Sequence, residues 1–336
     1  MEIIEGSSSI RPGLRSPIVT IGNFDGVHVG HQKIFQTVTR RAREVSGQSV
    51  CYTFEPHPQR IIAPDYCPPL LLTRRKKIAL IARQGIDLLI IEAFTHAFSQ
   101  QSAEDFLTKV LHAQLSPREV YVGHDFHFGK GRAASFASLQ AMGEKLGFGV
   151  HVIEEVLSED EEVSSSRIRR LVAEGKVEEA ARLLGRAFTV EGTVIPGAAR
   201  GQSLGFATAN IEVENELLPA DGVYAVFGRL GEPPEQEPRE VAGTAMVDPL
   251  AGKRLLAGVA NIGFAPTFGA RRRALEVHFL DVEGELYGSH VEVLFLGRLR
   301  EERKFSNAAA LAAQIGRDVE AARRLHAENE WRTRDE

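Results

Sequence analysis

The sequence IGNFDGVHVGH, residues 21–31, decides the fold of the first part of the chain. It follows an apolar run that ends at Ile21, and a helix-like run comes next, over residues 32–45. We therefore predict a strand that breaks at glycines and continues as a helix. In an open α/β sheet, ligands bind at such a place, beyond the carboxyl end of a strand and against a helix N-terminus.

Two histidines, His28 and His31, give this stretch its chemistry. Side chains three residues apart lie on one face of a helix, so both imidazoles can meet the same phosphate group. Histidines near a helix start are more often simply solvated or hydrogen-bonded, but glycines here allow a ligand to approach the backbone. We predict phosphate binding, with the accompanying candidates Gly22, Asn23, Phe24, Asp25 and Gly30.

Composition narrows the class of protein. A length of 336 residues favours two domains, and 43% hydrophobic with 25% charged residues is typical of a globular protein. The net charge of -5 argues against a general nucleic-acid binder, although it permits a local nucleotide pocket. Cys51 and Cys67 cannot form a disulfide framework. Neither a signal peptide nor a membrane span is expected, so we predict a cytoplasmic protein.

The first half of the sequence alternates strand-like and helix-like segments. This alternation predicts a doubly wound parallel sheet with right-handed crossovers. The expected strands are 18–22, 49–54, 88–92, 119–123 and 149–155, and the expected helices are 32–45, 74–84, 102–112 and 135–147.

Polar residues follow the expected strands, where the ligand crevice should lie. The fourth strand is followed by residues 123–132, which include Asp125. After the fifth strand come an acidic run, 158–162, and then serines with arginines at a helix start. Such serines can act as N-caps alone or, with the arginines, hold a polyphosphate. We favour the second role for Ser164, Ser165, Ser166, Arg167 and Arg169.

The pattern changes at residues 185–186, after a short helix expected over 174–184. Short strands at this spacing indicate an antiparallel sandwich or barrel. We predict a β-barrel with a closing amphipathic helix, 307–325, and domains 1–185 and 186–336. The expected strands are 187–195, 207–213, 222–230, 240–247, 254–262, 274–280 and 289–298.

The second half carries a second set of polar candidates. A glycine-rich loop, 197–205, contains Gly197, Arg200 and Gly201 and is typical of a segment that approaches phosphate. Thr208 and Asn210 alternate on one side of the next strand, and their oxygens suit Mg²⁺ that keeps water and phosphate ligands. Two polar residues on a solvated face are the simpler alternative. Glu276, within an apolar strand, is either solvent-facing or a base.

Together these motifs resemble the prokaryotic bifunctional riboflavin kinase/FAD synthetase family over nearly the whole chain. Residues 22–31 match its G-x-F-D-x-x-H-x-G-H signature. The segments 122–132 and 164–169 are similar to its V-G-x-D-F-x-F-G-x-x-R and S-S-[ST]-x-I-R motifs. In the second half the loop 197–205, the Thr208/Asn210 pair and the segments 221–224, 258–269 and 275–281 agree as well.

The resemblance implies two reactions on the substrates ATP, riboflavin and FMN. Riboflavin is phosphorylated to FMN in the second domain, with Mg²⁺ on Thr208 and Asn210 and Glu276 as the base. FMN is adenylylated to FAD in the first domain, where His28 and His31 stabilise the reacting phosphate. The resemblance also implies that Asn23 and Asp125 position nucleotide or metal. No nucleic acid, membrane or obligate protein partner is expected.

Two departures from the family pattern leave room for different functions. Gln202 stands where the family usually has arginine, and Ala207 where it usually has proline. One alternative is therefore an FAD synthetase with a second domain that only binds flavin. Two further hypotheses are an adenylyltransferase for another phosphorylated substrate and a non-enzymatic flavin or nucleotide sensor.

Overall fold

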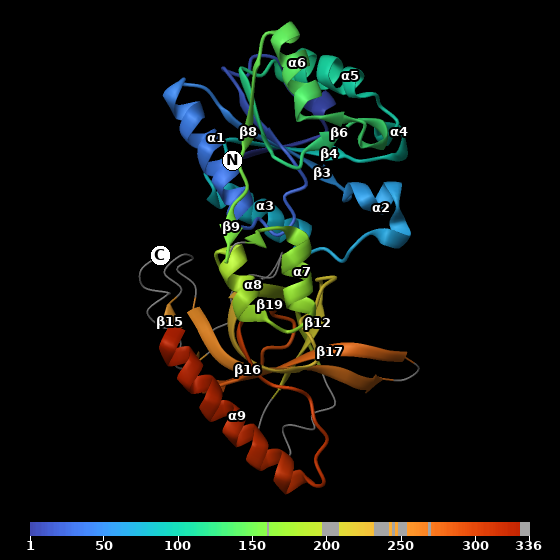
Figure 1. Ribbon diagram of the computed structural model, residues 1–336. Coiled ribbons are helices and arrows are strands. Elements are labelled where there is room, and N and C mark those ends of the chain that lie inside the picture. The colour runs from blue at the N-terminus through green and yellow to red at the C-terminus, as the bar shows by residue number, and fades with distance from the viewer. Residues whose placement is uncertain are drawn as a thin grey trace. The chain divides into compact units, whose positions relative to one another are not determined.

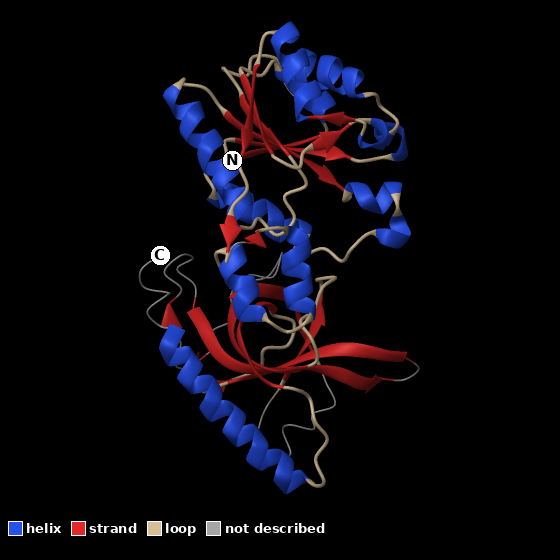
Figure 2. Cartoon of the chain, in the orientation of Figure 1, coloured by secondary structure: helices blue, strands red, loops and turns tan. Residues whose placement is uncertain are grey.

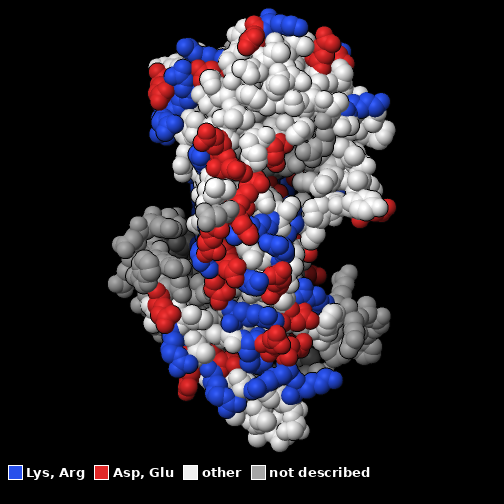
Figure 3. All heavy atoms as spheres, viewed as in Figure 1, with Lys and Arg blue, Asp and Glu red and all other residues white. Residues whose placement is uncertain are grey.

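The computed structural model describes residues 1–159, 161–196, 208–231, 242–243, 246–247, 254–267 and 270–329. The chain divides into two compact units, residues 1–165 and 166–336 (Figure 1). In the described part of the chain, no helix has the length and apolar character needed to cross a membrane. On the face drawn in Figure 3, acidic and basic side chains lie interspersed, which agrees with the small net charge of -5.

The first unit is built from short strands and the helices between them. Its strands are β1 (Glu2–Glu5), β2 (Ile18–Ile21), β3 (Ser49–Glu55), β4 (Leu88–Ala93), β5 (Glu119–Gly123), β6 (His127–Phe128), β7 (Ala134–Ser135), β8 (Gly149–Ile153), β9 (Leu157–Ser158) and β10 (Glu161–Glu162). Its helices are η1 (Ser7–Ser9), α1 (Val29–Glu44), α2 (Pro58–Ile62), η2 (Pro64–Tyr66), α3 (Arg74–Arg83), α4 (His96–Ser99), α5 (Ala103–Asp105), the π-helical η3 (Phe106–Leu115), η4 (Lys130–Arg132) and α6 (Phe136–Leu146).

A six-stranded parallel sheet forms the centre of this unit, in the order β1-β4-β3-β2-β5-β8. From β2 the chain moves outward through β3 and β4, and it then returns to the other side of β2 to form β5 and β8. The strand order therefore reverses between β2 and β5, which is where doubly wound sheets bind ligands. Helices cover both faces of the sheet (Figure 2).

The central strands β2, β3, β4 and β5 are buried on both faces, as the strands of parallel sheets are, whereas the edge strands β1 and β8 are more exposed. On one face, side chains such as Ile21, Tyr52 and Val122 pack against η3 and α6. On the other face, Ile34 and Phe35 belong to the buried side of α1. The predicted doubly wound parallel sheet is confirmed. The sequence reasoning missed β1, which is only four residues long and pairs with β4 at the edge.

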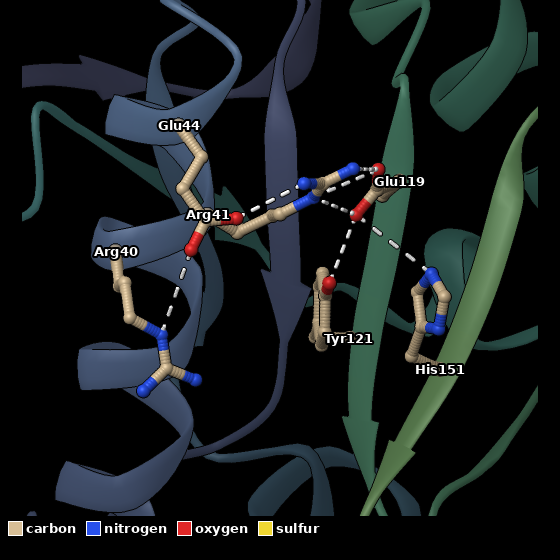
Figure 4. Close-up of polar contacts among 6 residues, drawn as sticks. All are labelled: Arg40, Arg41, Glu44, Glu119, Tyr121 and His151. Carbon is tan, nitrogen blue, oxygen red and sulfur yellow. Dashed lines mark hydrogen bonds and ion pairs between the residues drawn. The ribbon is translucent and has the colours of Figure 1, made fainter.

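A polar network closes the amino end of β5, the opposite end of the strand from the predicted ligand loops (Figure 4). The guanidinium of Arg41 donates to both carboxylate oxygens of Glu119, with Nε–O distances of 3.1 and 3.0 Å. The Tyr121 hydroxyl donates to the same carboxylate at 2.8 Å, and His151 Nε2 lies 3.7 Å from it. The bonds from Arg41 lower the pKa of Glu119, whereas burial raises the pKa of Tyr121 to about 12. This network ties α1 to β5 and β8.

The second unit begins with two helices and continues as β-structure. The helices are α7 (Ser165–Ala173), α8 (Val177–Leu184) and α9 (Ala308–Asn329). The described strands are β11 (Phe188–Ile195), β12 (Ala209–Val213), β13 (Gly222–Gly231), β14 (Ala242–Gly243), β15 (Met246–Val247), β16 (Arg254–Thr267), β17 (Ala270–Phe279), β18 (Val282–Glu283) and β19 (His290–Arg300).

Six antiparallel strands close into a barrel in the order β13-β19-β11-β12-β17-β16, because β16 also pairs with β13. The predicted antiparallel β-structure is confirmed, and closure selects the barrel over the sandwich. Helix α8 packs against β11 and β19, and the Arg298 backbone N–H donates to Glu178 at 3.2 Å. Since α8 packs on the barrel, the division into compact units falls before residue 185. The functional boundary at 185/186 stays a prediction.

The closing helix α9 packs on the outside of the barrel (Figure 1). Val223, Ala225 and Val259 on the strands form an apolar cluster with Ala322 of α9. Near the helix end, buried His326 lies 2.9 Å from the Val226 carbonyl oxygen through Nε2. Among the described residues its Nδ1 has no partner, so the neutral ring donates from Nε2 and cannot place a second proton. Burial accordingly lowers the pKa of His326.

Acid should therefore loosen the second unit through His326. Its pKa is lower in the folded chain than the ordinary 6.5, so below pH 6.5 the unfolded chain binds the proton first and stability falls. At pH 5.5 the loss is at most about 1.4 kcal/mol. We expect His326→Gln, whose amide can still donate to Val226, to lose less Tm between pH 7.5 and 5.5 than the wild type by calorimetry. An equal loss in both proteins would contradict the assignment.

Candidate active sites

The first candidate site lies between the end of β2 and the start of α1. The Gly22 backbone N–H donates to the Tyr52 carbonyl at 3.1 Å, and the Thr53 hydroxyl donates to the Asn23 carbonyl at 3.3 Å. These bonds hold the loop against β3, while β5 lies on the other side of β2. The loop therefore lies beyond the carboxyl end of β2, as residues 21–31 predicted, and the strand order places it at the reversal point of the sheet.

His28 and His31 lie against each other at the N-terminus of α1. Their ring centroids are 3.6 Å apart with 21° between the planes. His28 is the N-cap residue, and its Nδ1 accepts from the His31 backbone N–H at 3.3 Å. Because Nδ1 accepts, the neutral His28 ring carries its proton on Nε2. The structure thus brings both predicted histidines together and adds a capping role for His28 that the sequence reasoning did not include.

Because Gly30 has no side chain, the His28 ring can lie close to its α-carbon. A Cβ atom at Gly30 would lie 3.1 Å from His28 Nδ1 and 3.2 Å from Cε1. Such contacts are too tight for both groups to stay in place, so the ring would have to shift.

We expect Gly30→Ala to slow transfer chemistry at this site. Moving a catalytic group by about 1 Å can cost about 100-fold in rate, and the shift required here is smaller, so a loss of up to about 10-fold is expected in the first unit's reaction. The second unit's reaction should not change, and initial rates of both measure this. Gly316→Ala is the matched control, because Gly316 is also helical and has no atom within 4 Å of its Cβ position. Full activity in Gly30→Ala would show that the ring position is unimportant.

Phe24 and Asp25 lie beneath the loop, not at its surface. Both side chains are buried. The Phe24 ring packs on Phe35 at 4.7 Å and meets the His31 ring edge-on at 5.2 Å. The Asp25 carboxylate accepts the Leu71 backbone N–H at 3.2 and 3.1 Å. These contacts position the loop and the His31 ring, so Phe24 and Asp25 support the site from below.

Lys77 of α3 is a partly buried cation whose charge interacts with that of Asp25. Lys77 Nζ of α3 is 3.5 Å from the carbonyl oxygen of Phe54 at the end of β3. Burial lowers the pKa of Lys77, while nearby acidic groups, among them Glu55 and Asp25, oppose that shift. Sequence reasoning missed this lysine because it lies in a run of four basic residues, 74–77. The run itself does not show which of the four side chains points toward the sheet.

The serine cluster begins at the same loop. The Ser165 hydroxyl donates to the Asp25 carbonyl oxygen at 2.8 Å, which joins the predicted serine motif to the predicted glycine loop within the first unit. Ser164 is also partly buried, whereas Ser166 is exposed. Arg167 and Arg169 are partly buried residues of α7 in the second unit.

The loop after β5 presents Asp125 at the same edge of the sheet. Asp125 is exposed, and a Cβ at Gly123 would lie 3.2 Å from its Oδ1. The neighbouring His124 Nε2 is 3.9 Å from Glu155 and 3.4 Å from Glu162. All three side chains of that cluster are exposed, and their ligand atoms lie within 4.8 Å of one another.

The second candidate site is a row of polar residues across three neighbouring barrel strands. Asn210 of β12 pairs directly with Glu276 of β17, and Glu276 pairs with Asn261 of β16. Directly paired residues of antiparallel strands project to the same face, with Cβ atoms about 4.5–5.5 Å apart. The structure therefore sets a predicted metal ligand beside the predicted base.

This row lies on the outer face of the barrel, next to the closing helix. Leu275 and Val277, on either side of Glu276, are fully buried, so Glu276 projects away from the interior. Asn261 pairs with Val223, which packs against α9. All three residues of the row are partly buried. Thr208, also partly buried, is two residues from Asn210 and precedes β12.

Asn261 is the residue of this row that sequence reasoning did not single out. It lies in the segment 258–269, which matched the family as a stretch only. Its significance comes from strand register, and no local pattern shows which residues of two strands face each other. The predicted loop residues Gly197, Arg200 and Gly201 lie outside the described residues, as do Gln202 and Ala207.

Two family models match different parts of this chain. The FAD synthetase family model matches residues 11–167, and the riboflavin kinase family model matches residues 184–326. The bifunctional riboflavin kinase/FMN adenylyltransferase of Escherichia coli K12 is 35% identical over 306 residues, 91% of this chain and 91% of that protein. The protein of the same description from Pseudomonas fluorescens is 36% identical over 328 residues, 97% of this chain and 98% of that protein.

A solved structure is similar over almost the whole chain as well. It is described as a macrolide-efflux protein from Streptococcus pneumoniae, with a TM-score of 0.82 and 27% sequence identity. The match covers 96% of this chain and 99% of that chain.

Proposed function

The chain belongs to the bifunctional riboflavin kinase/FMN adenylyltransferase family, and on that basis we propose which of its residues carry the two reactions. It is a transferase. One reaction converts riboflavin and ATP to FMN and ADP, and the other converts FMN and ATP to FAD and pyrophosphate. The FAD synthetase match lies in the first part of the chain and the riboflavin kinase match in the second, and we place the functional boundary at 185/186.

His28 and His31 stabilise the adenylyl transfer. An oxygen of the FMN phosphate attacks the α-phosphorus of ATP, the bond to the bridging oxygen breaks, and pyrophosphate leaves. Negative charge grows on the non-bridging oxygens of the α-phosphate during this step. Imidazole N–H groups and the backbone N–H groups at the start of α1 are suited to that charge. The stacked rings at the helix N-terminus are the observation that carries this proposal.

The remaining predicted residues of the first site hold the nucleotide. Asn23 and Asp125 follow β2 and β5, the strands on either side of the reversal point, and we assign them to nucleotide positioning. Gly22 permits close approach, and Phe24 and Asp25 support the loop. Ser164, Ser165 and Ser166 offer hydroxyl donors to the β- and γ-phosphates, and Arg167 and Arg169 offer cations of the type that binds phosphate.

Glu276 is the base of the kinase reaction. It accepts the proton of the primary hydroxyl of riboflavin as that oxygen attacks the γ-phosphorus of ATP and ADP leaves. The direct pairing of Glu276 with Asn210 carries this assignment, because it sets the base beside the metal ligand that would hold the phosphates. Gly197, Arg200 and Gly201 are proposed to approach those phosphates from the loop before β12.

Thr208 and Asn210 fit a Mg²⁺ ion. A hydroxyl and an amide oxygen are hard ligands. Asn210 pairs directly with Glu276, and Thr208 precedes Asn210 by two residues. When bound, Mg²⁺ would offset negative charge on the transferring phosphate.

One incubation tests the assignment as a whole. Purified protein receives riboflavin, ATP and Mg²⁺, and the flavins are separated at intervals. FMN should appear first and FAD afterwards. FAD formed only from supplied FMN would support an FAD synthetase with a degenerate second domain, and a bound but unchanged flavin would support a sensor. Removal of Mg²⁺ with a chelator should stop the formation of FMN.

A further inference from the structure

A carboxylate from a distant part of the chain lies on the outer face of the barrel near Glu276. At Gly263 of β16, a Cβ atom would lie 2.5 Å from Oε1 and 3.0 Å from Oε2 of Glu302. The whole carboxylate therefore covers the α-carbon of Gly263 and fills the space that a side chain would take. A side chain at this position would make the carboxylate move aside.

The position of Gly263 places this carboxylate in the candidate kinase site. Gly263 follows Asn261 by two residues and so projects to the same face of β16. It pairs with Ala274, which precedes Glu276 by two residues on β17. The two small residues Gly263 and Ala274 thus form the pair directly beside the Asn261–Glu276 pair. Two residues along a strand span about 6.8 Å. Gly263, on which the Glu302 carboxylate lies, is therefore about that far along β16 from Asn261, the partner of Glu276.

Two arginines near Glu302, one on each side of it in the sequence, contact α9. Arg300 donates to both carboxylate oxygens of Asp318 in α9 at 3.1 Å through Nε, and again at 2.9 Å through Nη2. Arg303 donates to Gln314 of α9, and its guanidinium lies 5.0 Å from the Phe305 ring centre. These contacts hold the segment beside α9, and the Glu302 carboxylate lies on Gly263 of β16.

Glu302 itself is exposed and makes no hydrogen bond or ion pair with any residue that the structure describes. Asp318 and Asp221 are each paired with an arginine, whereas Glu301 is exposed, as Glu302 is. The Glu302 carboxylate, which lies on Gly263 beside the proposed base, is therefore available to a ligand of the kinase site. Its oxygens accept hydrogen bonds only, so it suits a ligand that presents hydroxyl donors.

We propose that Glu302 binds the phosphoryl acceptor, by accepting hydrogen bonds from the inner hydroxyl groups of the ribityl chain. This inference rests on the proposed kinase site. The ribityl chain carries several hydroxyls in a row, and only the terminal one reacts at Glu276. A second carboxylate one step along the same face holds the inner hydroxyls, which aligns the terminal oxygen with the base. Such alignment is a recognised source of rate in phosphoryl transfer.

The test compares riboflavin with an analogue that has a 5-hydroxypentyl chain in place of the ribityl chain. The analogue keeps the terminal hydroxyl and lacks the inner ones. In the wild type, riboflavin should be the better substrate by kcat/KM. Glu302→Gln should raise KM for riboflavin about 10-fold, as expected for the loss of a charged hydrogen-bond partner. It should leave the analogue unaffected, so the preference for riboflavin shrinks by the same factor.

Two further variants keep this test decisive. Gly263→Ala displaces the carboxylate without changing its charge and should lower the same preference. Glu301→Gln removes the exposed neighbouring carboxylate and should change nothing. FAD formation from supplied FMN should be equal in all of them, which reports on the first unit. A merely structural role for Glu302 would slow riboflavin and the analogue alike, and that outcome overturns the proposal.

Three other results would contradict the proposed binding of the ribityl chain by Glu302. Wild-type KM and preference in Glu302→Gln would overturn the inference while leaving the kinase assignment standing. A Mg²⁺ requirement that rises in Glu302→Gln, with KM for riboflavin unchanged, would make Glu302 part of a metal site instead. Absence of FMN formation in the wild type itself would overturn the kinase assignment together with this inference.

Discussion

Replacement of both His28 and His31 by alanine should stop FAD formation while riboflavin is still phosphorylated, so that FMN accumulates. Removing one preorganised donor of this kind typically costs about 100-fold to 1,000-fold in rate. Each single variant should show a loss of that size. The double variant should fall by less than the product of the two losses, because the stacked rings act as a unit. Separation of FMN and FAD during incubation with riboflavin and ATP measures both reactions at once.

The cap at His28 requires a second variant, since alanine there also removes the acceptor for the His31 backbone N–H. His28→Asn keeps an N-cap acceptor and should still lose FAD formation. His112→Ala, at an exposed histidine of η3, is the matched control and should keep both activities. FAD formation at the wild-type rate in the double variant would refute the assignment of the first site.

Glu276→Gln should abolish the formation of FMN and leave FAD formation from supplied FMN unchanged. The amide keeps the shape of the side chain and cannot accept the hydroxyl proton. General base catalysis contributes about 100-fold to 10,000-fold, and we expect a fall in kcat within that range. Because Glu276 acts in the transition state, KM for ATP should change little. Initial rates of FMN formation at several riboflavin and ATP concentrations separate the two parameters.

Glu212→Gln is the matched control for this variant. Glu212 is an exposed carboxylate of β12, two residues beyond Asn210 on the same face. It should keep full kinase activity. A kinase rate in Glu276→Gln equal to that of Glu212→Gln would remove Glu276 from the mechanism, and the pairing with Asn210 would then be structural only.

The local character of the first site could be predicted because its signals are contiguous. Glycines at 22, 26 and 30 and histidines at 28 and 31 lie within one turn and the start of one helix. A strand that breaks at glycines and continues as a helix has few other conformations. What this segment did not reveal is that Asp25 faces inward and accepts from Leu71, because that partner lies far along the chain.

The second site shows the opposite case. Thr208 and Asn210 were predicted from their alternation along a strand and the chemistry of their oxygens. Periodicity left Glu276 undecided between solvent and catalysis, and the family resemblance implied its role as the base. Strand register shows which residues Glu276 lies beside. The pairing of Asn210 with Glu276, and of Glu276 with Asn261, follows from how β12, β17 and β16 align. A shift by one residue would turn each side chain to the other face.

The sequence by itself determined the two kinds of architecture and most of the chemistry. Alternating strands and helices, then closely spaced strands, required a parallel sheet followed by antiparallel structure, because hydrophobic periodicity is a local property. Tertiary structure alone decided that residues 21–31 stand where the strand order reverses, that the second part closes into a barrel, and that Glu302 covers Gly263. Each of these depends on contacts between segments far apart in the chain, and those contacts exist only once the chain has packed.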